Sequence, residues 1–188
     1  MSVRIISGDR RGAKLRTPDG DETRPLRDRI RQSLFNILRD DLRGVHVLDA
    51  FAGSGAVGLE ALSNGAASAV FIESSTVASG IIRANINKLR YEERAIAILG
   101  SSPDAPGRSP LIKNPFDILF LMPPYHSELC QTVLKDAAVL RRCSAKCVAV
   151  VEIHESEIFE APAGWELTDE RKYGTTRLIF LRRAATDS

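Results

Sequence analysis

Apolar positions along residues 45–183 follow two alternating patterns. Short, mostly apolar runs predict buried strands, and longer segments with apolar positions three or four residues apart predict helices. Strands are predicted at residues 45–51, 68–74, 95–101, 116–121 and 146–153, with a terminal antiparallel pair around Gly174 within residues 165–183. Helices are predicted at residues 56–65, 75–90 and 127–142. The alternation is typical of an α/β fold with a mostly parallel central sheet and helices on both faces.

Residues 1–43 show a different pattern. Residues 3–6 and 13–16 predict two short strands around a turn rich in Gly and Arg, and residues 24–42 carry apolar side chains at helical spacing. We therefore predict a β-hairpin-plus-helix extension at residues 1–43, followed by the α/β domain at residues 44–188. Residues 101–115, rich in Pro and Ser, interrupt the pattern where another helix is expected.

Charge is unevenly distributed along the chain. The formal net charge is only +2, but residues 1–31 contain eight Arg and one Lys. The planar guanidinium is a good bidentate partner for phosphate, so an ordered basic extension indicates contact with nucleic acid. A solvated charge run that only aids solubility is the alternative.

Membrane, disulfide and metal signals are absent from the sequence. No apolar stretch approaches the roughly 20 residues that span a bilayer, and the first residues lack the apolar block of a signal peptide. The three cysteines, Cys130, Cys143 and Cys147, are odd in number and form no CxxC pair. We expect a cytoplasmic, monomeric protein with inert thiols and no bound metal.

A glycine-rich loop follows the first predicted strand. Asp49 ends that strand, and Gly53, Gly55 and Gly58 match the pattern GxGxxG. Such glycines can admit the pyrophosphate of a dinucleotide, which keeps an oxidoreductase open as an alternative. Asp49 would repel a pyrophosphate and favours a cationic ligand such as S-adenosylmethionine, whose amino group the carboxylate could receive directly or through water.

Glu73 ends the second predicted strand. An acid at this place in nucleotide-binding α/β folds accepts hydrogen bonds from ribose hydroxyls. The alternative is a charge that stabilises the N-terminus of the following helix by ~0.5 kcal/mol. Pairing with Asp49 at the neighbouring strand end favours the cofactor role.

The fourth predicted strand, at residues 116–121, is followed by Met122, Pro123, Pro124 and Tyr125. Residues before proline adopt extended geometry, and proline has no N–H, so the turn is rigid and its carbonyls are free to accept hydrogen bonds. Taken alone, a strand-ending turn with Tyr125 in the core explains the same residues. Its place beside the predicted cofactor site favours a role in holding the substrate.

Six segments, in order and spanning nearly the whole chain, resemble the bacterial RsmD family. They are RIISGDRRGAKL, RPLRDRIRQSLFNIL, LDAFAGSGAVGLEALSNGA, FIES, ILFLMPPY and KYGTTRLIFLRR. The resemblance implies a Rossmann-like class I methyltransferase that uses S-adenosylmethionine to methylate the exocyclic N2 amine of a guanine in 16S rRNA. The substrate it implies is the small ribosomal subunit or an assembly intermediate of it.

The resemblance also implies roles for particular residues. The cofactor would be held by Asp49, Ala52, Gly53, Ser54, Gly55 and Glu73, with Ser101 after the third strand where relatives carry an acid or amide. The target base would be held by the turn at residues 122–125. For contact with rRNA we favour the basic residues of the extension, namely Arg10, Arg11, Lys14, Arg24, Arg27 and Arg29.

Met122 departs from the family pattern, which is DPPY or DPPF. The methionine thioether cannot replace the carboxylate as an acceptor for the amine hydrogens. A catalytically weakened or inactive relative that still binds cofactor and rRNA is therefore an open alternative. His126, Ser127 and Glu128 are nearby polar residues that could substitute for the lost acceptor.

Two further classes remain open. A DNA amino-methyltransferase also uses such a proline turn, but the 188 residues leave little room for the target-recognition insertion usual in that class. An RNA-binding protein without a cofactor is the non-enzymatic alternative.

Overall fold

The computed structural model describes residues 3–18, 28–104 and 113–184. A seven-stranded sheet has the order β3-β2-β1-β4-β5-β7-β6. β1 to β5 run parallel, and β7 pairs antiparallel with both β5 and β6. The strands are β1 (His46–Asp49), β2 (Ser68–Glu73), β3 (Ala95–Leu99), β4 (Phe116–Leu121), β5 (Cys143–His154), β6 (Trp165–Tyr173) and β7 (Thr176–Arg183). The predicted mostly parallel sheet with a terminal antiparallel pair is confirmed.

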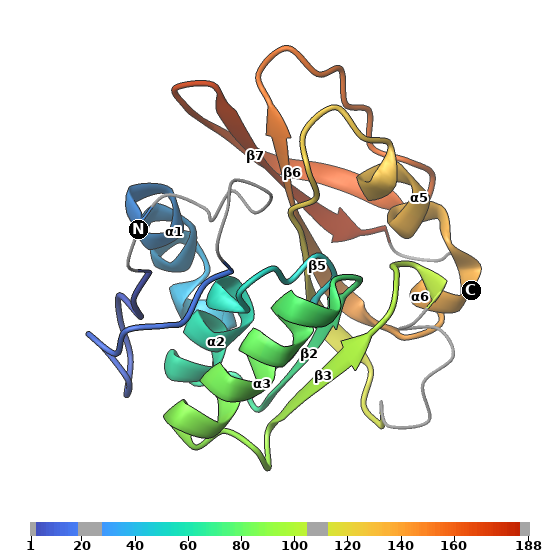
Figure 1. Cartoon of the computed structure of the whole chain (residues 1–188). Helices are drawn as coiled ribbons and strands as arrows, with labels where there is room; N and C mark the ends of the chain where they lie inside the picture. The colour runs from blue at the N-terminus through green and yellow to red at the C-terminus, as the bar shows by residue number, and fades with distance from the viewer. Residues whose placement is uncertain (1–2, 19–27, 105–112, 185–188) are drawn as a thin grey trace.

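Helices cover both faces of the sheet, as Figure 1 shows. On one side lie α1 (Asp28–Ile37), α2 (Ala56–Ser63) and α3 (Thr76–Leu89), and on the other α5 (Leu129–Lys135) and α6 (Ala137–Leu140). A 3-10 turn, η1 (Arg39–Asp41), follows α1. Each face has its own core: Phe120 and Val150 pack with the first group of helices, whereas Leu119 and Val151 pack with the second.

The helix predicted at residues 127–142 is divided at Asp136. This residue has an extended backbone (φ −69°, ψ 119°), and its carboxylate accepts hydrogen bonds from the backbone N–H groups of Ala138 and Val139. An aspartate that caps a new helix start in this way competes with continuation of the preceding helix. The strand predicted at residues 146–153 is also longer, because β5 begins at Cys143.

The N-terminal extension packs directly on the α/β domain. Its predicted hairpin is reduced to one isolated bridge between Arg4 and Lys14, supported by backbone bonds such as Leu15 N–H to the carbonyl of Val3 (2.8 Å). Ile5 is buried in the same core as α1, α2 and the sheet. Of the helix predicted at residues 24–42, α1 covers residues 28–37, while residues 24–27 lie outside the described residues. Among the described helices, none is long and apolar enough to cross a membrane.

Candidate functional site

The carboxyl ends of the parallel strands bring several predicted site residues to one edge of the sheet. β1 lies between β2 and β4, so the direction of strand addition reverses at β1, which is where α/β folds bind ligands. The Ala50 N–H donates to the carbonyl of Phe120, and the Ala52 N–H donates to that of Ile72, each at 3.0 Å. These bonds fix the loop after β1 against the ends of both neighbouring strands.

Asp49 is a buried acid at the centre of this edge. Only 2% of its surface is exposed, and its Oδ2 accepts a hydrogen bond from the backbone N–H of Gly58 at 3.0 Å. Burial raises the pKa of Asp49 to about 7, the Gly58 bond opposes the rise, and the nearby charge of Glu73 adds to it. Ionised Asp49 is therefore costly in the empty protein, and a cationic ligand would offset that cost.

The three glycines of the GxGxxG pattern have different reasons to be glycine. Gly53 (φ 54°) and Gly55 (φ 78°) adopt left-handed backbone conformations, and Gly55 is the N-cap of α2. Gly58 has no such conformation, but a Cβ there would lie 2.4 Å from the ring of Phe71 on β2. The last glycine of the GxGxxG pattern thus allows close packing of α2 on the sheet.

Glu73 connects the loop after β1 to the start of α3. Its Oε2 accepts from the N–H of Gly53 and its Oε1 from the N–H of Ser75, both at 2.8 Å. A carboxylate has about four acceptor positions, so these two bonds leave room for ribose hydroxyls. The Gly100 N–H donates to the Glu73 backbone carbonyl (2.9 Å), which brings exposed Ser101 to the same edge.

Asn85 is a site residue that sequence reasoning missed. Its side-chain amide on α3 donates to the carbonyl of Ser54 in the glycine loop at 3.0 Å. The same side chain accepts from the N–H of Arg16 (2.8 Å) and donates to the carbonyl of Arg16 (3.0 Å). Only its burial within a helix distinguishes it, and no local pattern signals its two distant partners.

The turn after β4 is held by its tyrosine. The Tyr125 hydroxyl donates to Oε1 of Glu152 on β5 and shares a hydrogen bond with Oγ1 of Thr176 on β7, both at 2.8 Å. Met122 is half-buried and packs against the core on the α1 side of the sheet. Pro123 is buried and Pro124 exposed, and the carbonyl of Pro124 already accepts from the Ser127 hydroxyl at 2.8 Å.

The His154 ring lies between those of Tyr125 and His126 in a chain of ring contacts. The ring centroids of Tyr125 and His154 are 5.6 Å apart, and those of His126 and His154 are 5.2 Å apart. His126 has φ 60°, a left-handed conformation that is uncommon for a residue with a side chain. Burial raises the pKa of Glu152, and the hydrogen bond from Tyr125 opposes that rise. Sequence reasoning did not single out Glu152, because its partner on the proline turn is distant along the chain.

The basic residues of the extension differ in their availability. Arg11, Lys14 and Arg29 are exposed, whereas Arg10 donates through Nε to the carbonyl of Leu89 (2.9 Å) and lies 5.6 Å from the ring centroid of Tyr91. Arg31 is fully buried and pairs with Glu60, so it is not part of a basic surface. Arg24 and Arg27 lie outside the described residues.

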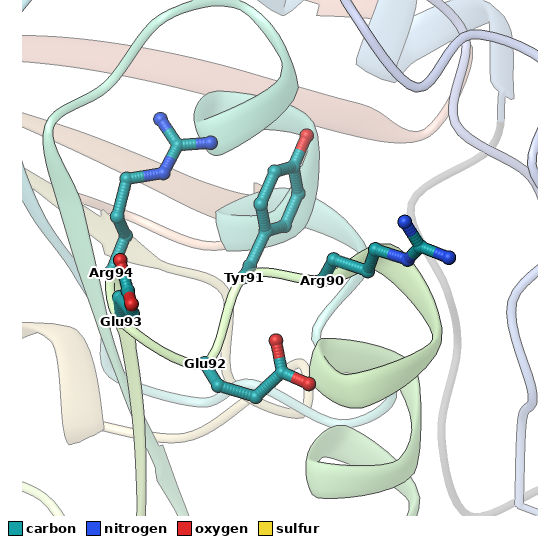
Figure 2. Close-up of a pocket in the computed structure, with 5 residues that line it drawn as sticks. All are labelled: Arg90, Tyr91, Glu92, Glu93 and Arg94. Carbon is teal, nitrogen blue, oxygen red and sulfur yellow. The ribbon is translucent and has the colours of Figure 1, made fainter.

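Figure 2 shows a surface hollow lined by residues 90–94, between the end of α3 and the start of β3. The Arg94 guanidinium lies 4.8 Å from the ring centroid of Tyr91, whose hydroxyl donates to Asp9 at 2.5 Å. The hollow lies at the amino edge of the sheet and includes none of the predicted site residues. Its contacts explain how the extension is anchored. In the described ranges, no three His, Cys, Asp or Glu side chains are placed to hold a metal ion.

Comparison with known proteins identifies the family. The family model described as "Conserved hypothetical protein 95" matches residues 3–182. Ribosomal RNA small subunit methyltransferase D of Escherichia coli (strain K12) is 33% identical over 186 residues, covering 97% of this chain and 91% of that protein. The chain belongs to the methyltransferase D family. A family member from Haemophilus influenzae is 30% identical over 172 residues, covering 92% of this chain and 89% of that protein.

Solved structures agree with membership of the methyltransferase D family. The Escherichia coli protein YhhF has a TM-score of 0.84 and 32% identity, covering 99% of this chain and 100% of that chain. The predicted Rossmann-like class I methyltransferase fold and the predicted RsmD resemblance are confirmed, which argues against the dinucleotide oxidoreductase. Individual site residues stay predictions.

Proposed function

We propose that the chain transfers a methyl group from S-adenosylmethionine to the exocyclic N2 amine of a guanine in 16S rRNA. The observation that carries this proposal is the contact between two loops at the sheet edge. The Ala50 N–H, one residue after Asp49, donates to the carbonyl of Phe120, two residues before Met122. A loop suited to a cationic cofactor therefore lies against a turn suited to a target base.

The described residues suit S-adenosylmethionine. Asp49 would receive the amino group, Glu73 the ribose hydroxyls, and Gly53 and Gly55, flanked by Ala52 and Ser54, would allow close backbone approach. Ser101 would lie near the adenine end. The cofactor supplies an electrophilic methyl group, and a cation would lower the pKa of Asp49 that burial raises.

The turn at residues 122–125 would hold the extruded guanine. Tyr125 would stack on the base, and its hydroxyl bonds to Glu152 and Thr176 restrict the ring to one orientation. The lone pair of the N2 amine is delocalised into the base, so orientation of the amine by acceptors matters more than a strong base. Pro123 and Pro124 contribute carbonyls and stiffness to this arrangement.

The basic extension would contact rRNA phosphates. Arg11, Lys14 and Arg29 are exposed and suited to this role, Arg10 is partly committed to protein contacts, and Arg24 and Arg27 complete the predicted set. The partner would be the small ribosomal subunit or its assembly intermediate, and the protein would bind it as a monomer in the cytoplasm. Residues 1–43 would then act as an RNA-contacting extension of a methyltransferase domain at residues 44–188.

A weakened or inactive relative is the second candidate, and Met122 is the observation that favours it. The side chain packs against apolar neighbours and supplies no strong acceptor. Loss of one such hydrogen bond costs ~1–3 kcal/mol, or roughly 5- to 150-fold in rate, if nothing replaces it.

Transfer of labelled methyl groups to undermethylated small subunits tests both candidates. We expect turnover by the wild-type protein and a new N2-methylguanine in 16S rRNA by mass spectrometry of cells with and without the gene. Wild-type inactivity together with a large gain in Met122→Asp supports the weakened relative. Titration with S-adenosylmethionine and with NAD provides the cofactor control, and binding of NAD alone contradicts the proposal.

A further inference from the structure

Glu152 lies beside Met122 at the carboxyl end of the sheet. β4 and β5 run parallel, their last paired residues are Leu121 and Val151, and Met122 and Glu152 each follow directly. Because side chains alternate along a strand, Met122 shares the face of Phe120. In the same way Glu152 shares the face of Val150, which is the residue paired with Phe120. Phe120 and Val150 belong to one core, against which Met122 also packs. The thioether and the carboxylate therefore occupy neighbouring positions on one face.

The Glu152 carboxylate is fixed from the side of the proline turn. Its Oε1 accepts from the Tyr125 hydroxyl at 2.8 Å, and that hydroxyl also bonds to Thr176 on β7 at 2.8 Å. Any base that stacks on Tyr125 is consequently held close to this carboxylate. A position fixed by packing and hydrogen bonds is what orientation of a reacting group requires.

The second oxygen of Glu152 differs from the first in its contacts. None of the described residues donates a hydrogen bond to Oε2, and none forms an ion pair with Glu152. The side chain is nonetheless half-buried on the edge of the core. A partly desolvated carboxylate oxygen that accepts no hydrogen bond from the described residues can take one from an exocyclic amine, which offers N–H donors.

We propose that Glu152 accepts a hydrogen bond from the target amine and thereby supplies the acceptor that Met122 lacks. The assignment rests on the proposed methylation of a guanine amine. In this chain the acceptor would be Glu152, two residues before the end of β5, in place of the residue directly after β4, while the stacking tyrosine and the prolines keep their places. In this chain the methionine thus coexists with a working site.

The other polar residues near the turn are less suited to this role. The Ser127 hydroxyl donates to the carbonyl of Pro124, and the His126 ring packs against His154. Glu128 is exposed at the N-cap of α5. None of the three has the neighbouring strand position and the bond to Tyr125 that Glu152 combines.

The test compares Glu152→Gln and Glu152→Asp in the wild-type and Met122→Asp backgrounds. Gln keeps one acceptor for Tyr125 and loses the free carboxylate oxygen, so we expect kcat for methyl transfer to fall about 5- to 150-fold with unchanged affinity for S-adenosylmethionine. Glu152→Asp keeps a carboxylate and should retain more activity. Introduction of Met122→Asp should reduce the loss caused by Glu152→Gln. Glu166→Gln, at an exposed position on β6, is the matched control and should keep wild-type kcat.

The outcomes separate the two proposals. Full kcat in Glu152→Gln, with guanine methylated, overturns the role of Glu152 and leaves the proposed function standing. A wild-type protein that binds S-adenosylmethionine but methylates guanine only after Met122→Asp also overturns it. Absence of methylated guanine with either residue at position 122 contradicts the proposed function itself. Thermal unfolding shows whether Glu152→Gln folds, and if it does not, the comparison rests on Glu152→Asp. The kcat of Glu152→Asp should fall and should recover when Met122→Asp is added. An unchanged kcat in Glu152→Asp overturns the assignment.

Discussion

The carboxylate of Glu60 lies 3.6 Å from the guanidinium of Arg31, and neither side chain has any exposed surface. Glu60, on α2, also accepts from the N–H groups of Ile6 (2.8 Å) and Ser7 (2.7 Å). Arg31, on α1, donates to the carbonyl of Arg4 at 2.5 Å. One buried ion pair therefore connects residues 4–7, α1 and α2.

Glu60→Gln should destabilise the protein strongly. Removal of the Glu60 charge leaves buried Arg31 with only the half-exposed carboxylate of Asp28, 3.0 Å away, as its counter-charge. Loss of a buried partner typically costs ~3–5 kcal/mol of unfolding free energy, and with Asp28 still in place we expect a loss of ~3 kcal/mol. Urea unfolding measures the loss, and Glu166→Gln on the exposed side of β6 should stay within about 0.5 kcal/mol of wild type. Equal midpoints for the two variants would show that the pair does not hold the extension.

Gly58→Ala and Gly80→Ala form a matched pair on neighbouring helices. A Cβ at Gly58 would lie 2.4 Å from Phe71, whereas a Cβ at Gly80 meets nothing within 4 Å. We expect Gly58→Ala to destabilise by ~1–3 kcal/mol through overpacking. Gly80→Ala should stabilise by ~0.5–1 kcal/mol because alanine is the better helix former. Thermal unfolding distinguishes them, and a neutral Gly58→Ala would mean that α2 is not closely packed on β2.

The affinity for S-adenosylmethionine should rise with pH. Burial raises the pKa of Asp49 to about 7, so the carboxylate passes from mostly protonated to mostly ionised between about pH 6 and pH 8. Only the ionised form attracts the ammonium group of the cofactor, and an α-amino group itself loses its proton at about pH 7.7–8.0, so we expect the rise up to about pH 7. Calorimetric titration across this range should show the rise, and Asp49→Asn should bind weakly with a much flatter profile. An affinity of the wild-type protein that does not change with pH would contradict this role of Asp49.

The same pKa has the opposite consequence for the stability of the empty protein. A raised pKa means that the folded state binds the Asp49 proton more tightly than the unfolded state does. The contribution of Asp49 to the unfolding free energy is therefore full below about pH 4 and decreases as the pH rises toward about 7. Asp49→Asn should flatten this part of the stability profile, measured by denaturant unfolding without cofactor. A profile that the substitution leaves unchanged would rule out the shift.

Paired charge reversal at Arg11 and Lys14 should weaken binding to rRNA. Both side chains are exposed on the hairpin, so the Arg11→Glu and Lys14→Glu double variant should bind more weakly and reduce the slope of log affinity against log salt by about 2. Filter binding at several salt concentrations provides the measurement. Arg141→Glu, exposed after α6 on the other side of the sheet, is the control and should leave the slope unchanged. A double variant with the wild-type slope would exclude the hairpin from the interface.

Local patterns explain what could be predicted from the sequence. Strands such as β4 are buried on both faces, so their apolar runs are visible without any knowledge of the fold. The break at Asp136 was missed because capping competes with helical periodicity only when the carboxylate reaches the next turn. Glu60 and Asn85 were missed because their partners lie 54 and 69 positions away. Contacts of this kind depend on how helices and strands pack in the folded protein, so no short segment of the sequence reveals them.

Asn85 connects the N-terminal hairpin with the glycine loop. Its side-chain amide forms hydrogen bonds with the backbone of Arg16 in the hairpin and with the carbonyl of Ser54 in the glycine loop. Because both segments bond to the same buried side chain on α3, a displacement of one would strain the hydrogen bonds of the other. By thermodynamic reciprocity, any factor by which RNA changes the affinity for the methyl donor equals the factor by which the donor changes the affinity for RNA.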